Sequence, residues 1–148
     1  MRKMVIAIIC WFIVTNASAV SCFLTMLKDN CWQDYDVTVN AVDTKTHQTV
    51  TQIVIPKGKS WARQAFVCSA SQIFEFQATF SPVIWADQKD RVYSSQRYWQ
   101  LPAALSKGTA AWNIVMCYGQ DFANLPLPPT ATSHCACDAS QVPAIPPQ

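Results

Sequence analysis

The stretch "YDVTVNAVDTKTHQTVTQIVI", residues 35–55, decides the fold class. In its first part Val37 and Val39 point to one face, and the polar residues between them point to the other. Such alternation is typical of a half-buried strand. The polar "DTKTHQ" then turns the chain, and residues 49–55 return with β-branched side chains. The stretch therefore predicts a β-hairpin.

The following segments continue the same pattern. "PKGK" (56–59) is a turn with Gly58 at the permissive position, and "SWARQAFVC" (60–68) and "QIFEFQATF" (72–80) are strand candidates. In the second of them, four residues share the apolar face: Phe74, Phe76, Ala78 and Phe80. Both segments extend the predicted sheet structure beyond the hairpin.

Two more strands are expected near the C-terminal end, at "QRYWQL" (96–101) and "AAWNIVMCY" (110–118). Strong helix formers nowhere gather at a 3.6-residue period over a useful length. About seven short strands separated by turns favour an all-β, immunoglobulin-like β-sandwich. We assign this sandwich to residues 20–124.

The N-terminal segment has the form of a secretory signal peptide, residues 1–19. Arg2 and Lys3 precede the apolar "VIAIICWFIV" (5–14), and "NASA" follows. About ten apolar residues are too few to cross a bilayer, which needs about twenty. No later segment is long and uncharged enough to do so. The mature chain is therefore expected to be exported and to have no transmembrane span.

Two cleavage sites compete at the end of this leader. "ASA" predicts cleavage after Ala19, whereas "AVSC" is a degenerate lipobox that would make Cys22 a lipid-modified N-terminus. Cleavage after Ala19 removes Cys10 and leaves six cysteines: Cys22, Cys31, Cys68, Cys117, Cys135 and Cys137. An even number of cysteines in an oxidising compartment predicts three disulfides, which favours cleavage after Ala19 over a lipid anchor at Cys22.

The pairing of these cysteines is constrained by "CAC". Cys135 and Cys137 are too close in sequence to bond to each other without strain, so each is expected to pair elsewhere. If Cys68 and Cys117 bridge each other across the sandwich, Cys22 and Cys31 take the two remaining partners in either order. In that hypothesis, two disulfides link the N-terminal segment to the C-terminal arm.

Residues 125–148 form a compositionally distinct C-terminal arm. They contain most of the prolines and no lysine or arginine. Proline removes backbone donors and favours extended polyproline II structure. Such an arm is typical of a disordered linker or of a ligand for a proline-binding groove, but its cysteines would pin it to the domain. We expect a pinned, extended arm through about Cys137 and loose residues after it.

Several function classes lack support in the sequence. Removal of the leader leaves nine basic and nine acidic residues and no basic stripe, which argues against nucleic-acid binding. "HCAC" and the distant His47 do not supply a plausible zinc ligand set, so no metal or cofactor is expected. Glu75, the only glutamate, has no evident carboxylate partner, and no catalytic motif is present. No catalytic residue is predicted, and the protein is not expected to be an enzyme.

The aromatic residues are the remaining functional candidates. Most should be core, but those in "VYSSQRYWQLP" flank polar residues. Exposed aromatic residues beside arginine are typical of protein interfaces, and stacking on sugars is a second use of the same chemistry. The interaction candidates are Tyr93, Arg97, Tyr98 and Trp99.

The runs "PKGKSWARQAFVC", "FQATFSPVIW", "RYWQLP" and "CYGQDFANLPLPP" carry a resemblance that spans about residues 31–129. The chain resembles small exported proteins of Legionella and Coxiella relatives, some of which are accessory subunits of the Dot/Icm type IVB secretion system outer-membrane core complex. The resemblance implies a non-enzymatic structural role among protein subunits of an envelope complex, in the periplasm or at the outer membrane. The alternatives are a secreted binding module for carbohydrate or a host protein, and an envelope hydrolase or redox protein.

Overall fold

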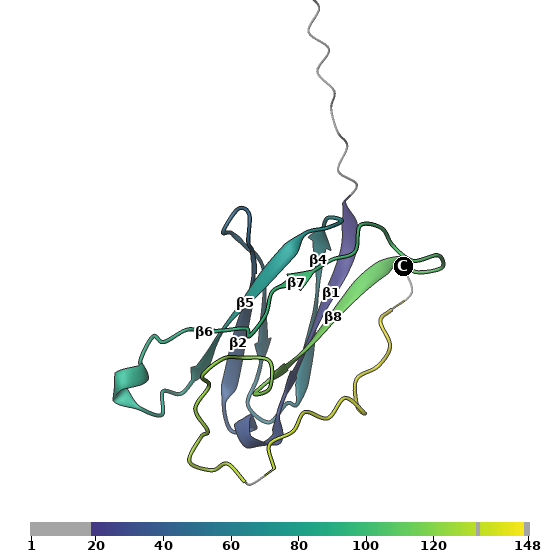
Figure 1. The fold of residues 1–148 in the computed structure, drawn as a ribbon. Coiled ribbons are helices and arrows are strands. Elements are labelled where there is room, and N and C mark those ends of the chain that lie inside the picture. Colours follow the sequence, from purple (N-terminus) through teal and green to yellow (C-terminus); the bar gives the residue numbers. More distant parts are fainter. Residues whose placement is uncertain (1–18, 133, 147–148) are drawn as a thin grey trace, which may run out of the picture.

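The computed structural model describes residues 19–132 and 134–146, and within them the chain forms eight strands and two short 3-10 turns (Figure 1). The elements are β1 (Val20–Lys28), η1 (Asn30–Trp32), β2 (Asp36–Asp43), β3 (Thr49–Ile55), β4 (Trp61–Cys68), β5 (Ile73–Ser81), η2 (Ala86–Gln88), β6 (Tyr93–Ser94), β7 (Trp99–Gln100) and β8 (Ala111–Tyr118). The predicted signal peptide lies outside the described residues, apart from Ala19.

The strands form two sheets that pack as a sandwich. One sheet has the order β4-β1-β8, and the other has the order β3-β2-β5-β6, with β7 also pairing with β5. β1 and β8 run parallel, and every other pairing of these strands is antiparallel. The all-β sandwich that the sequence predicts is thereby confirmed. Among the described residues, no helix is both long and apolar enough to span a membrane.

The alternating segments of the sequence became strands with the expected faces. β2 buries Val37 and Val39, and β5 buries Phe74, Phe76 and Ala78 completely. The predicted strand at residues 96–101 is shorter than expected, because only Trp99 and Gln100 pair with β5. A separate two-residue strand, β6, precedes it.

β1 is the one long strand that the sequence did not predict. Cys22, Leu24 and Met26 belong to the core, and the residues alternating with them, from Phe23 to Leu27, are buried as well. A strand covered on both sides has a continuous apolar run with no alternation. Because "VSCFLTMLK" follows an apolar leader, it had no period-two signal by which to be recognised.

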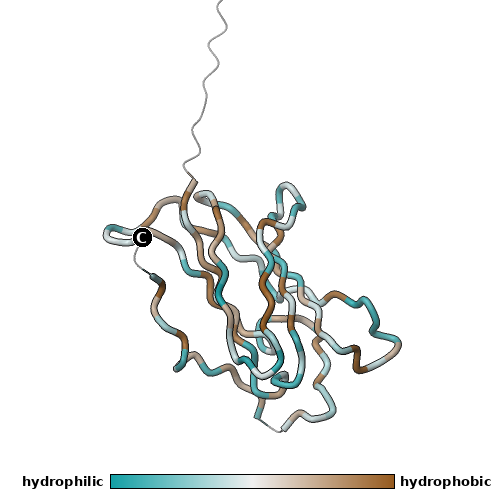
Figure 2. The backbone as a smooth tube through the Cα atoms, turned by 180° about the vertical axis from the view of Figure 1, so that it is seen from behind, coloured by the Kyte–Doolittle hydropathy of each residue, from teal (hydrophilic) through white to brown (hydrophobic). Residues whose placement is uncertain are grey.

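The core between the sheets is rich in aromatic side chains. Trp32, from η1, is 1% exposed and contacts three rings, with centroids 5.4 Å from Tyr35, 4.7 Å from Phe80 and 5.2 Å from Tyr118. Figure 2 shows hydrophobic segments along the strands, whereas the turn between β2 and β3 is hydrophilic. Trp32 thus anchors the core at the end of the sandwich where β1 leads into β2.

Gly119, directly after β8, is required by a close approach to Asp29. Its φ is +125°, and a Cβ added there would lie 2.0 Å from the Asp29 Oδ2 atom. We expect Gly119→Ala to lower the free energy of unfolding by about 1–3 kcal/mol, measured by urea denaturation, because the backbone is strained and the carboxylate must move.

A double-mutant cycle separates the two causes. Asp29→Ser keeps an oxygen that can accept the Cys31 N–H but shortens the side chain next to Gly119. The cost of Gly119→Ala should therefore be smaller in the Asp29→Ser background. An equal cost in both backgrounds would assign the whole effect to the backbone and contradict the clash.

Candidate functional site

Three disulfides fasten the sandwich and the C-terminal arm together. They join Cys22 to Cys68, Cys31 to Cys135, and Cys117 to Cys137. All six predicted cysteines are thus bonded, and the two cysteines of "CAC" pair elsewhere, as the sequence predicted. Disulfides of this kind indicate an oxidising environment outside the cytosol.

The predicted Cys68–Cys117 bridge was wrong, and the strand order explains why. β1 lies between β4 and β8. Cys68 pairs in register with Val20 at one end of β1, whereas Cys117 pairs with Leu27 near the other end. Seven residues of extended strand separate the two positions by about 23 Å, far beyond the reach of a disulfide. Cys68 bonds instead to Cys22, which lies beside it on the core face.

The lipid-anchor alternative at Cys22 gains no support from this arrangement. The Cys22 sulfur is bonded to Cys68, and the residue is fully buried. A thioether lipid would need the same sulfur atom. Cleavage before Cys22 would also remove Val20 and Ser21, which pair with Cys68 and Val67 in the sheet.

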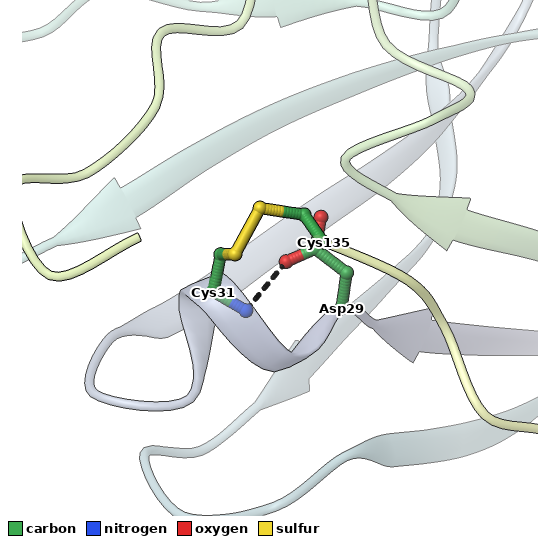
Figure 3. A group of neighbouring side chains, drawn as sticks. All are labelled: Asp29, Cys31 and Cys135. Atoms are coloured by element: carbon green, nitrogen blue, oxygen red, sulfur yellow. Dashed lines mark hydrogen bonds between the residues drawn. A yellow bond between two sulfur atoms is a disulfide. The ribbon is translucent and has the colours of Figure 1, made fainter. Parts of the chain in front are cut away.

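The disulfide between Cys31 and Cys135 lies against the Asp29 carboxylate (Figure 3). Ligand atoms of these three residues lie within 4.8 Å of one another, a spacing that would suit a metal ion if the cysteines were thiolates. Both sulfurs are already bonded, however, and Asp29 Oδ1 accepts a hydrogen bond of 2.9 Å from the Cys31 N–H. The cluster is therefore a structural joint between η1 and the arm.

Burial sets the protonation of Asp29. Loss of hydration raises the pKa of its carboxyl group, and the backbone N–H groups of Cys31 and Trp32 offset only part of this rise. The side chain is 2% exposed. The protonated form is therefore favoured more in the folded protein than in the unfolded chain.

This shift predicts a pH dependence that Asp29→Asn should remove. A raised folded pKa gives stability that is complete below the usual value near 3.8 and is lost as the pH rises through the folded pKa. The neutral asparagine retains an acceptor for Cys31 and suffers no such loss. Denaturant unfolding from acidic to neutral pH should show the variant gaining stability relative to the wild type as the pH rises. A constant difference would contradict the raised pKa.

Lys28, the residue before Asp29, is a buried cation with a structural role. Its Nζ donates hydrogen bonds to the carbonyls of Tyr35 at 2.7 Å and Pro56 at 2.9 Å, and it is 1% exposed. Burial lowers its pKa, although Asp36 and Asp34 oppose the shift. Lys28 therefore ties β1 to the segments that flank β2 and β3.

The predicted interaction candidates separate into one core residue, Tyr93, two exposed residues, and Trp99, which is partly buried and packs against the core. Tyr93 is 3% exposed, and its hydroxyl donates to Gln88 Oε1, so it is a core residue and not an exposed aromatic residue. Arg97 is exposed and its guanidinium carbon lies 5.9 Å from the centre of the Trp99 ring. Tyr98 is 67% exposed. Arg97, Tyr98 and Trp99 form what we call the Tyr98 patch.

A second surface arrangement, which the sequence did not predict, lies on the outer face of the β4-β1-β8 sheet. Arg63 on β4 donates from Nε to Thr25 Oγ1 at 2.8 Å, and Thr25 donates to Asn113 Oδ1 at 2.8 Å. One residue from each strand thus contributes to a single hydrogen-bonded row. Thr25 is fully buried, so the row holds the arginine in a fixed orientation.

The rest of the Arg63 guanidinium holds the C-terminal arm. Nη2 donates to the Pro143 carbonyl at 2.7 Å and Nη1 to the Ala144 carbonyl at 3.1 Å. Because Cys137 is bonded to Cys117, the arm passes from the end of β8 to Arg63 over this face of the sheet (Figure 1). Residues predicted to be loose after Cys137 are therefore docked at least as far as Ala144.

The histidines and the glutamate considered for catalysis and metal binding do not converge on one site. His47 is exposed in the turn between β2 and β3, with φ of 57°. His134 is exposed in the arm, where its carbonyl accepts from Asn30. Glu75 lies on the partly exposed face of β5, opposite the core residues Phe74 and Phe76.

Comparison with known proteins identifies no family for this chain. No protein-family model matches it, and no curated protein matches it either.

Proposed function

We propose that the protein is a non-enzymatic, exported subunit that works by binding other proteins. The observation that carries this proposal is the Tyr98 patch. A tyrosine that is 67% exposed lies next in sequence to an arginine whose guanidinium carbon is 5.9 Å from the centre of the Trp99 ring. Tyrosine, tryptophan and arginine are the residues most enriched at the energetic centres of protein interfaces.

The segment that carries the Tyr98 patch is held in place by neighbouring parts of the fold. Trp99 pairs with Phe74 of the core strand β5, and Gln96 bonds to the backbone of the segment after β8, so the patch is held on both sides. A rigid patch loses little conformational entropy when a partner binds.

For the setting, we propose the cell envelope of a bacterium with a type IVB secretion system, in or near its outer-membrane core complex. The sequence resemblance over about residues 31–129 supports this setting, and disulfides suit the periplasm, which is oxidising. A soluble periplasmic form is proposed in preference to a lipid-anchored one, because the Cys22 sulfur is bonded to Cys68.

The experiment compares wild-type protein with an Arg97→Ala/Tyr98→Ala variant in fractionated envelopes. Wild type should sediment with large detergent-resistant particles, and the double variant should show at least about a tenfold smaller bound fraction. Val67→Ala is the matched control, because Val67 is 71% exposed on β4, outside the patch.

The outcomes separate the alternatives. Wild type free in the culture medium would overturn the envelope proposal and favour a secreted binding module. Sedimentation of both forms to the same extent would overturn the role of the Tyr98 patch. Loss of binding by Val67→Ala but not by the double variant would move the interface to β4.

A further inference from the structure

The Arg63 side chain binds the backbone carbonyls of an extended segment. Its guanidinium presents two N–H groups to the carbonyls of successive residues, Pro143 and Ala144. A third hydrogen bond, from Nε to the Oγ1 atom of the buried Thr25, fixes the orientation of the guanidinium group. No carboxylate of the described residues pairs with Arg63, so backbone carbonyls are its counterparts there.

The arm segment that it holds has the character of polyproline II structure. Its described part, "VPAIP" (residues 142–146), has prolines three positions apart, Pro143 and Pro146. Val142 and Ile145 are partly buried, whereas Pro143 and Ala144 between them are exposed. Partly buried residues three positions apart match the three residues per turn of polyproline II, whose carbonyls have no partners within the helix.

Beside this contact lies a hollow that none of the described arm residues lines. It measures about 650 Å³ and is lined by residues 56 and 58–63, including Lys59, Trp61 and Arg63. The Arg63 guanidinium carbon lies 5.8 Å from the centre of the Trp61 ring. A bound extended segment therefore has an aromatic, basic surface beside the Arg63 contact.

We propose that Arg63, Thr25, Asn113 and Trp61 form a recognition site for extended proline-containing polypeptide segments, which the chain's own arm occupies in cis. Arg63 binds two successive carbonyls, and the prolines hold the ligand extended. Apolar residues three positions apart face the sheet. A segment of the same chemistry from another chain displaces the arm and uncovers the outer face around Phe23 and Leu27.

This inference uses residues outside the Tyr98 patch, so it stands or falls separately from the proposed function. The chain used is full-length, with residues 142–148 replaced by glycine and serine, and all three disulfides retained. The probe is the synthetic peptide VPAIPPQ, titrated against isotope-labelled protein by NMR. We expect saturable shifts of the Arg63 Nε–H and Trp61 Nε1–H signals at up to millimolar peptide.

Wild type should bind the same peptide several-fold more weakly, because its tethered arm competes at an effective concentration in the millimolar range. Arg63→Lys in the replaced-arm chain should weaken binding about tenfold, since an ammonium group lacks the two-pronged fork. Two control peptides should also bind at least about tenfold more weakly: VGAIGGQ, which lacks the prolines, and SPASPPQ, which lacks the apolar anchors.

Other results would overturn the proposal. Absence of shifts with VPAIPPQ, or equal binding by the Arg63→Lys chain, would remove Arg63 from recognition. Equal binding of VGAIGGQ would show that the site does not select proline-containing segments, and equal binding of SPASPPQ would remove the apolar anchors.

A second measurement uses a chain with its natural arm, so that its result does not depend on correct folding of the replaced-arm chain. Arg63→Ala should release the arm, so the backbone amide of Ala144 should become mobile on the nanosecond timescale while that of Cys137 stays rigid. An Ala144 amide equally rigid in wild type and Arg63→Ala would contradict the docking role of Arg63.

Discussion

Replacement of both Cys22 and Cys68 by alanine is expected to lower the free energy of unfolding by about 4 kcal/mol. The disulfide closes a segment of 46 residues and therefore restricts the unfolded chain strongly. It also lies in the core, since the two residues are 0% and 2% exposed. The change is measured by urea or guanidinium denaturation under non-reducing conditions, with the other two disulfides intact.

Peptide mapping of the same variant provides the control. Cys31 should still be joined to Cys135, and Cys117 to Cys137, because these bonds form at the opposite end of β1. An unfolding free energy equal to that of wild type would contradict the stabilising role of the Cys22–Cys68 bond. Wild-type peptides that join Cys68 to Cys117 would contradict the strand order itself.

Trp32→Ala should have an effect of similar size, about 3–5 kcal/mol, because it removes a large, fully packed side chain. Trp32 contacts Tyr35, Phe80 and Tyr118, which come from three different parts of the chain. Their rings cannot all close on the space that the indole leaves. The loss should appear as a lower midpoint in denaturant-induced unfolding.

Trp85→Ala is the matched control for this substitution. Trp85 is only partly buried and lies in the loop before η2, which projects from the sandwich (Figure 1). Its replacement should cost less than about 1 kcal/mol. Equal losses for the two variants would contradict the central position of Trp32 in the core.

The sequence was informative where a strand buries only one face. β2 and β5 alternate along their length, so their positions and inward residues could be predicted from the chain alone. β1 could not, because both of its faces are buried and its sequence does not alternate. The disulfide pairing failed for a related reason: it depends on β1 lying between β4 and β8, and strand order is a property of the whole fold.

The Arg63 site could not be predicted from any single segment of the sequence. Its hydrogen-bonded row takes Thr25, Arg63 and Asn113 from three strands, and none of these residues has a distinctive sequence context. The signal present in the sequence was the arm, whose composition is typical of a ligand for a proline-binding groove. The residues that hold the arm lie on the same chain, and only the assembled sheet brings them together.

The pairing of the cysteines also decides how the molecule withstands proteases. Cys22 is joined to Cys68, Cys31 to Cys135, and Cys117 to Cys137, so the three closed loops overlap in sequence. Every peptide bond between Cys22 and Cys137 lies within at least one of them. Hydrolysis of any single bond in that span would therefore leave the nicked chain as one covalent piece, including a cut in the exposed loop around η2.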